Sequence, residues 1–532
     1  MASEGARGSR SKPKREEFPD VKLPEDVLSH WQSTMCFQLQ RLVERALKGS
    51  PETSSIRLLP YGETPETAKP TLIVGCTSTA KVKHALKRHF KYDANVYDVR
   101  VKKEVIRRCR RGRRRRESEA SRSMAPMRDS SMEKAANPDY QERPLCGASI
   151  GAFRYEEHLP PVSFGGVVMV DGRPYGMSVH HMLEPEEDSD DEEDGEEGDD
   201  DESETSSLGS GSDDEELSED DLSTVRPPSA HSSDDEPTPM NDTAGDCPGI
   251  LPGDMEEIAI TQPALDDAID CDLHAEEDED DEDSGIDEDH LLSFKLGQVH
   301  ASSGLRRTAK SHEGGFKSIS QSLPQEIDWA LFELVPPRAY PFNIIKGGMR
   351  YCLSGGDRKG NSLPIAVKSS SDLACVKVHC LGRTSGLGNG TVSSTMELVK
   401  IHGRSTFSAS WTIAGNFGVG GDSGAWVISN EDGQVCGHVL ASRTGRTYIC
   451  PMDLLLEDIR ATLGASEVAL PVVTAEEVYG SRPSSSKSGK SEDRAAVEDA
   501  FRKMRLQGSE HGGVALPGSM RASTQLTVDP VG

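Results

Sequence analysis

The chain has few aromatic residues and no long apolar run. Phe, Trp and Tyr make up 5% of its 532 residues, and hydrophobic residues make up 34%. No stretch reaches the ~18 apolar residues that a membrane-spanning helix needs, which excludes a conventional transmembrane helix. The opening residues, MASEGARGSRSKPKREE, contain no apolar segment like that of a secretory signal. We therefore expect a soluble protein that is not secreted and makes no membrane contact.

Cysteines are present, but they lack the pattern of a disulfide scaffold. There are eleven, an odd number, scattered from Cys36 to Cys450 without paired spacing. That usage is typical of a reducing compartment. The expected location is therefore intracellular, either nuclear or cytoplasmic.

The net charge of −30 is unevenly distributed along the chain. Most of the negative charge lies in an acidic, Ser-rich segment between Glu184 and His290. Such a segment cannot bury enough apolar surface to offset its ordering entropy. We expect residues 185–290 to be a disordered acidic insertion, and residues 1–20 and 471–532 to be disordered as well.

A strongly basic tract, KKEVIRRCRRGRRRR (102–116), overlaps the start of the expected basic and polar linker over residues 105–143. It fits a nuclear localisation signal, a nucleic-acid contact or a solvated linker. Nucleic acid is disfavoured because no aromatic residues are interleaved to stack on bases. The acidic insertion is either a solvated tether or a gate that folds over a basic surface such as residues 107–116 of the same chain.

Two kinds of periodicity divide the rest of the chain. Helical and strand-like patterns alternate over residues 21–104, which predicts a small α+β domain without a catalytic motif. Short β-rich runs separated by turn signals, such as Asp171-Gly172, dominate residues 144–470. A final helix over residues 452–464 closes this region. The pattern predicts an all-β barrel or sandwich interrupted by the acidic insertion.

Within the β-rich region, GVGGDSGAW (418–426) places Ser423 on a glycine-rich turn. A serine hydroxyl becomes a nucleophile only beside a histidine, which a carboxylate orients, and with N–H donors for the oxyanion. Glycine allows the backbone to turn so that the N–H groups of Gly421 and Ser423 converge. The turn therefore predicts a nucleophile together with an oxyanion hole.

Three motifs resemble those of the trypsin-like (chymotrypsin-fold) serine peptidase family, in that family's order. They are SVHHML (178–183), DWALFEL (328–334) and GGDSGA (420–425). The resemblance implies a double β-barrel in which His181 is the general base, Asp328 orients it and Ser423 attacks. It also implies a serine endopeptidase that acts on proteins or peptides and needs no metal or organic cofactor.

Flanking segments extend the resemblance. GRTSGLGNGTV (382–392) looks like the hairpin that opens the second barrel, and GHVLAS (437–442) looks like the strand that pairs with substrate. The latter implies that Leu440, Ala441 and Ser442 bind substrate. The interval from the histidine to the aspartate motif exceeds the family's by about the length of the acidic insertion. The family's zymogen motif is absent, so Asp422 needs another partner than a new N-terminus.

Several assignments have rivals in the sequence. His180 competes with His181 as the base, and Asp372 competes with Asp328 as the carboxylate. Phe417 is either the floor of the specificity pocket or an ordinary core aromatic. CVKVHC (375–380) is either strand core or, less in keeping with its spacing, part of a metal site.

Two other classes of function stay open at the level of the whole chain. One is an inactive peptidase homologue that acts as a protein-binding or regulatory scaffold. The other is a nuclear, nucleic-acid-associated factor built on the basic tract.

Overall fold

The computed structural model describes part of the chain, which includes both regions with periodic patterning. The described residues are 15–19, 21–109, 134–184, 248–254, 257–271, 273, 285–305, 307–310, 323–352, 360–401, 404 and 406–472. The expected disorder of residues 1–14, 185–247 and 473–532 lies outside them. So do residues 110–116, the C-terminal part of the basic tract. Disorder of residues 1–20 is wrong at their C-terminal part, because strand β1 (Glu16–Glu17) pairs antiparallel with Tyr61 and Gly62.

The N-terminal unit is an α+β layer, as its periodicity predicts. Helix α1 (Glu25–His30), a π-helical segment (Trp31–Met35) and helix α2 (Cys36–Ala46) follow one another without a break. Strand β2 (Ser54–Gly62) pairs antiparallel with β3 (Lys69–Cys76), and β3 pairs parallel with β4 (Asp98–Lys103). Helix α3 (Thr79–His89) makes the crossover that a parallel pair requires.

A closed β-barrel forms the centre of the molecule. Its strands run in the order β17, β16, β20, β21, β22 and β19, and a further pairing between β17 and β19 closes the ring. Their bounds are Lys377–Gly382 (β16), Gly386–Val392 (β17), Ser408–Gly415 (β19), Trp426–Ser429 (β20), Val435–Arg443 (β21) and Arg446–Pro451 (β22). Both flanking motifs thus lie in this barrel, since residues 382–392 contain the whole of β17 and residues 437–442 lie in β21.

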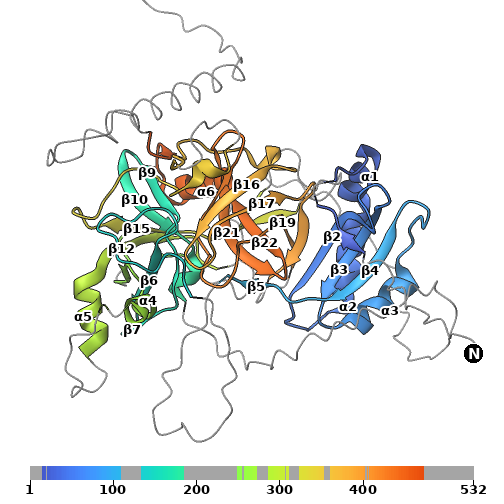
Figure 1. The fold of residues 1–532 in the computed structure, drawn as a ribbon. Helices are drawn as coiled ribbons and strands as arrows, with labels where there is room; N and C mark the ends of the chain where they lie inside the picture. The colour runs from blue at the N-terminus through green and yellow to red at the C-terminus, as the bar shows by residue number, and fades with distance from the viewer. Residues whose placement is uncertain are drawn as a thin grey trace, which may run out of the picture.

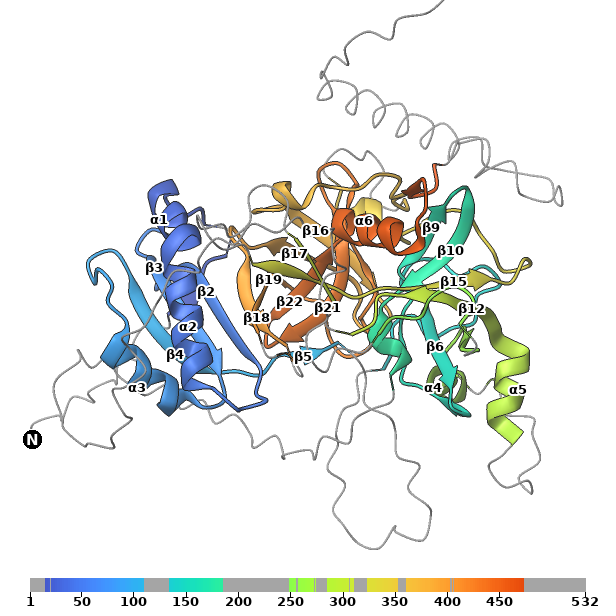
Figure 2. The same cartoon turned by 180° about the vertical axis from the view of Figure 1, so that it is seen from behind.

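The N-terminal unit continues the barrel's sheet. Strand β18 (Glu397–Lys400) pairs with β19 on one side and with β2 on the other. Figures 1 and 2 show the N-terminal unit, in blue, beside the barrel, with strand β5 (Arg107–Arg108) lying along the barrel. The unit is therefore joined to the barrel through backbone hydrogen bonds.

A second, mainly antiparallel sheet packs beside the barrel. Its order is β23-β9-β10-β15-β12-β11-β6-β7, with β8 on β6. The bounds of its strands are Ser149–Arg154 (β6), Glu157–His158 (β7), Val162–Ser163 (β8), Gly166–Val170 (β9), Arg173–Ser178 (β10), Ala259–Thr261 (β11), Lys295–Ser302 (β12), Ala330–Leu334 (β15) and Val468–Ala469 (β23). The turn between β9 and β10 has φ of 46° at Asp171 and 80° at Gly172, as a DG hairpin predicts. The pairings of the described residues leave this sheet open, so the double barrel stays a prediction.

The expected disorder of residues 185–290 is wrong for their C-terminal part. Strand β11 (Ala259–Thr261) pairs with both β6 and β12, and helices α4 (Leu265–Asp270) and α5 (Gly285–Phe294) flank it. The reason is the apolar run within EIAITQPAL, because Ile258 and Ile260 are fully buried. The C-terminal part of the insertion therefore supplies the strand that lies between β6 and β12 in the second sheet.

The expected linker over residues 105–143 also needs correction. Arg107–Arg108 forms strand β5, which pairs antiparallel with β21 of the barrel. Further along, the N–H groups of Ala136 and Asn137 donate to the carbonyl of Arg383, each at 2.9 Å. The described residues at both ends of the segment 105–143 thus form backbone hydrogen bonds with the barrel or with the loop after β16.

Helix α6 (Met452–Leu463) follows β22 and packs against the barrel, as the sequence predicts. Within the described ranges no helix is long and apolar enough to span a membrane.

Candidate active site

Asp328, His181 and Ser423 form a continuous hydrogen-bonded chain at the junction of the two sheets. Nδ1 of His181 lies 2.7 Å from Oδ2 of Asp328, and Nε2 of His181 lies 2.9 Å from Oγ of Ser423. All three residues are almost completely buried. The structure thus brings together the three residues that the motifs single out, although they are far apart in the sequence.

Strand pairing places the histidine and the aspartate. Strand β10 leads into the 3-10 turn that carries His181, and β15 begins two residues after Asp328. The two strands pair with Ser178 opposite Ala330, so their ends meet. Oδ1 of Asp328 then accepts the backbone N–H groups of His180 and His181 at 2.6 and 3.2 Å. These bonds fix the carboxylate and leave Oδ2 for the imidazole.

The electrostatics of the site keep Asp328 ionised. Burial by itself raises the pKa of this carboxyl group. The charge of His181 and its hydrogen bond outweigh burial, so the pKa of Asp328 lies far below its ordinary value of 3.8. The carboxylate is therefore a hydrogen-bond acceptor at every physiological pH, as an orienting group must be.

The rival residues lie elsewhere. Nδ1 of His180 is 2.9 Å from Oγ of Ser302, and its Nε2 is 3.2 Å from Oε1 of Glu184. Asp372 is exposed on a 3-10 turn, where it accepts a hydrogen bond from Ser371. Of each rival pair, only His181 and Asp328 belong to the chain that ends at Ser423.

The turn that carries Ser423 is held by the side chain of Asp422. Oδ1 of Asp422 accepts the N–H groups of Thr384 and Ser385 at 3.0 and 3.1 Å, and Oδ2 accepts those of Gly418 and Val419 at 2.9 and 3.1 Å. The partner that the sequence left open is thus a set of four backbone amides. The carboxylate ties the turn to the loop after β16.

The N–H groups of Gly421 and Ser423 converge, as the sequence predicts for an oxyanion hole. Gly421 has φ of 94°, a conformation that disfavours other residues. Both N–H groups donate to one oxygen, the backbone carbonyl of Cys109, at 2.7 and 3.2 Å. The two N–H groups are therefore already oriented toward a single oxygen, and that oxygen is the carbonyl of Cys109.

The residues expected to bind substrate line the same place. Ala441 and Ser442 of β21 pair with Arg108 and Arg107, and the carbonyl of Leu440 lies 3.5 Å from Oγ of Ser423. Phe417 is buried in the apolar cluster that includes Cys109. This position shows core packing, and its role as a pocket floor stays a prediction.

A buried ion pair that the sequence did not predict packs against the turn that carries Gly421 and Ser423. The guanidinium of Arg383 bonds both carboxylate oxygens of Asp267, and both side chains are fully buried. A Cβ added at Gly421 would lie 2.6 Å from Nη1 of Arg383, so the pair packs directly against the turn. Asp267 belongs to α4, inside the expected acidic insertion, and one aspartate among so many gives no signal in the sequence.

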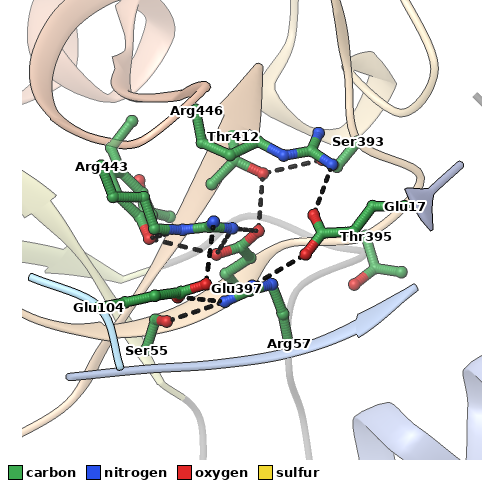
Figure 3. Close-up of polar contacts among 12 residues, drawn as sticks. Glu17, Ser55, Arg57, Glu104, Ser393, Thr395, Glu397, Thr412, Arg443 and Arg446 are labelled. Carbon is green, nitrogen blue, oxygen red and sulfur yellow. Dashed lines mark hydrogen bonds and ion pairs between the residues drawn. The ribbon is translucent and has the colours of Figure 1, made fainter. Parts of the chain in front are cut away.

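A buried network of charges joins the N-terminal unit to the barrel beside this site (Figure 3). Arg57 of β2 binds both oxygens of Glu104 at 2.7 and 2.8 Å and Oε1 of Glu17 at 3.0 Å. From the barrel, Arg446 binds Glu17 at 2.8 Å and Arg443 lies 3.7 Å from Glu104. Glu104 directly precedes the segment that enters the site, so the network fixes where that segment starts.

The metal interpretation of residues 375–380 finds no support in the structure. His379 contacts Oδ1 of Asn430 through Nδ1 at 2.8 Å and Oγ of Ser362 through Nε2 at 3.2 Å. No group of side chains suited to hold a metal occurs among the residues that the structure covers. Those ring contacts fit a buried strand residue.

Comparisons with known proteins add little to this geometry. No protein-family model matches the chain, and no curated protein matches it. Among solved structures, Protease A of Thermobifida fusca is similar over 59% of this chain and 95% of its own, with 10% identity and a TM-score of 0.26. At so low a TM-score the likeness does not establish a common fold. The functional assignment therefore rests on the side-chain geometry.

Proposed function

We propose that the chain is a serine endopeptidase. The observation that carries the proposal is the hydrogen-bonded chain from Asp328 through His181 to Ser423, directly beside two converging N–H groups. An activated serine and an oxyanion site are the two components that acyl transfer needs. Strand β21 adds an edge along which a peptide backbone can lie.

The proposed mechanism uses only groups of the chain and water. Oγ of Ser423 attacks the scissile carbonyl carbon while Nε2 of His181 takes its proton. The N–H groups of Gly421 and Ser423 stabilise the oxyanion. His181 then protonates the leaving amine, and the amide bond breaks to leave an ester on Ser423. Water, deprotonated by His181, hydrolyses the ester and restores the serine.

A test must take account of the Cys109 carbonyl between the two N–H groups. In the variant Cys109→Glu, a carboxylate would have to enter a buried position near Asp422. We expect the segment to leave the site instead, because an unpaired buried charge costs several kcal/mol. The probe is a fluorophosphonate, which labels activated serines.

We expect the Cys109→Glu chain to be labelled and its double variant with Ser423→Ala not to be. Adding Asp328→Asn to Cys109→Glu should slow labelling by roughly three to four orders of magnitude, because the imidazole loses its orienting carboxylate. The matched control is Asp372→Asn, which changes the rival carboxylate and should leave labelling unchanged. A folded Cys109→Glu chain that stays unlabelled would indicate an inactive homologue.

A further inference from the structure

The segment that leaves the N-terminal unit lies in the candidate active site as a substrate would. Arg107 and Arg108 form β5, antiparallel to β21, with Arg108 opposite Ala441 and Arg107 opposite Ser442. This is the addition of an extended strand to a sheet edge, the mode in which many proteins bind peptides. The residues of β21 that pair here are among those expected from the sequence to bind substrate.

Cys109 occupies the position of the residue whose carbonyl would be attacked. Its carbonyl oxygen accepts the N–H groups of Gly421 and Ser423 at 2.7 and 3.2 Å. The same Ser423 is hydrogen-bonded through its Oγ to His181 at 2.9 Å. The carbonyl of Cys109 is therefore held by the two N–H groups expected to form the oxyanion hole. The same site holds Ser423, whose Oγ is hydrogen-bonded to its expected base, His181.

The side chains of the segment fit their surroundings. The Sγ atom of Cys109 donates to the carbonyl of Gly418 at 3.0 Å, and the residue is 1% exposed. Ile106 is buried among apolar residues that include Leu440 and Ala441. The Arg108 guanidinium lies 3.9 Å from Oδ2 of Asp328. The candidate site thus accommodates the apolar Ile106, the basic Arg108 and the small Cys109 along one extended segment.

Contacts elsewhere in the fold hold residues 106–109 at the candidate active site. Glu104 is held by Arg57 in the buried charge network, and the N–H of Ile106 donates to Thr53 of the N-terminal unit at 2.9 Å. The unit itself is joined to the barrel through the pairing of β2 and β18. The local concentration of the segment at its site is therefore very high, since no encounter in solution is needed.

We infer that the chain cleaves itself between Cys109 and Arg110. Resting on the proposed peptidase function, this inference names the first substrate. Oγ of Ser423 forms an ester with the carbonyl carbon of Cys109, the bond to the nitrogen of Arg110 breaks, and that nitrogen takes the proton held by His181. Water then releases Cys109 as a C-terminal carboxylate. The products are residues 1–109 and a chain that begins at Arg110.

The test is the intact mass of the purified full chain, with sequencing of any new N-terminus. We expect two fragments that meet between Cys109 and Arg110, and a single uncut chain for Ser423→Ala. Cys109→Ala should still be cut, because a smaller side chain fits the same place. Cys109→Glu should stay intact, since its segment no longer enters the site.

The outcomes separate this inference from the proposed function. If the wild type stays whole while Cys109→Glu is labelled by the fluorophosphonate, the site is a competent peptidase and self-cleavage is refuted. The segment would then be an internal inhibitor. If the wild type is whole and Cys109→Glu, shown by circular dichroism to be folded, is unlabelled, both proposals fail. Cleavage at another bond, or cleavage that persists in Ser423→Ala, also refutes the inference.

Discussion

At the scale of single residues, Asp422 shows how a buried charge organises the candidate site. Its carboxylate satisfies four backbone N–H groups from two loops, at distances of 2.9–3.1 Å. Charged hydrogen-bond acceptors form strong bonds, and a buried N–H that loses its partner costs free energy. The turn with Gly421 and Ser423 therefore depends on this side chain for its shape, without any ammonium group from a new N-terminus.

We expect Asp422→Asn to destabilise the fold and weaken the site. The amide keeps one acceptor oxygen but turns an NH₂ group toward the other pair of N–H groups. The free energy of unfolding should fall by about 1–3 kcal/mol, as measured by urea denaturation. Labelling of Ser423 in the Cys109→Glu background should fall as well. Asp372→Asn, an exposed control, should change stability by about 0.5 kcal/mol or less. Equal stabilities of the two variants would contradict this role.

At the scale of elements, helix α4 connects the insertion to the oxyanion turn. The helix has only six residues, yet it carries Asp267 into a fully buried pair with Arg383. Strand β11, just before it, fixes its position by pairing with β6 and β12. The C-terminal part of the insertion is thus a structural component of the site.

Asp267→Ala should be strongly destabilising, because it leaves the guanidinium of Arg383 buried without its carboxylate. Breaking such a pair typically costs about 3–5 kcal/mol. Thermal and urea unfolding followed by circular dichroism would measure the loss. Asp289→Ala, which removes an exposed aspartate of helix α5, is the matched control. We expect that control to lose about 0.5 kcal/mol or less, and a similar loss in both variants would argue against the bracing role.

At the scale of the whole molecule, the N-terminal unit and the barrel share one sheet and one buried charge network. Burial by itself raises the pKa of Glu104, but the hydrogen bond and charge of Arg57 outweigh it and hold that pKa below its ordinary value of 4.5. The pKa of Glu17 is likewise lowered, with burial opposed by Arg57, Arg443 and Arg446. A depressed carboxyl pKa stabilises the fold above the ordinary value, and this contribution is lost as the pH falls toward the folded-state pKa.

The variant Glu104→Gln tests this coupling through pH. At pH 7 it should lower the free energy of unfolding by about 1.5–3 kcal/mol, the range for hydrogen bonds to charged groups. Its difference from the wild type should shrink below pH 4.5, because the carboxyl group of the unfolded chain is protonated there and the stabilisation is lost as the pH falls toward the folded-state pKa. Melting temperatures across pH 3–8 would show this convergence. Glu63→Gln, in a surface pair with Arg15, should have little effect at any pH. A constant difference across that range would contradict the pKa argument.

What the sequence determined by itself was the choice of residues for the candidate site and most of the local structure. SVHHML, DWALF and GGDSG each lie within a few residues, so the choice of His181, Asp328 and Ser423 needed no long-range information. Turn residues and apolar alternation likewise predicted the β9–β10 hairpin and the strands of the barrel. Short-range signals of this kind are what a sequence displays directly.

Only the tertiary structure decided how distant segments meet. The residues around Arg108 do not predict that it pairs with Ala441. Nor do they predict that the carbonyl of Cys109 accepts the N–H groups of Gly421 and Ser423. The basic composition of that tract fitted a nuclear localisation signal, a nucleic-acid contact or a solvated linker, and none of these predicts the observed pairing. The acidic composition of the insertion likewise gave no sign that Asp267 is buried. Composition averages over neighbours along the chain, whereas burial and pairing depend on residues hundreds of positions away. The occupant of the candidate active site was therefore visible only in the folded molecule.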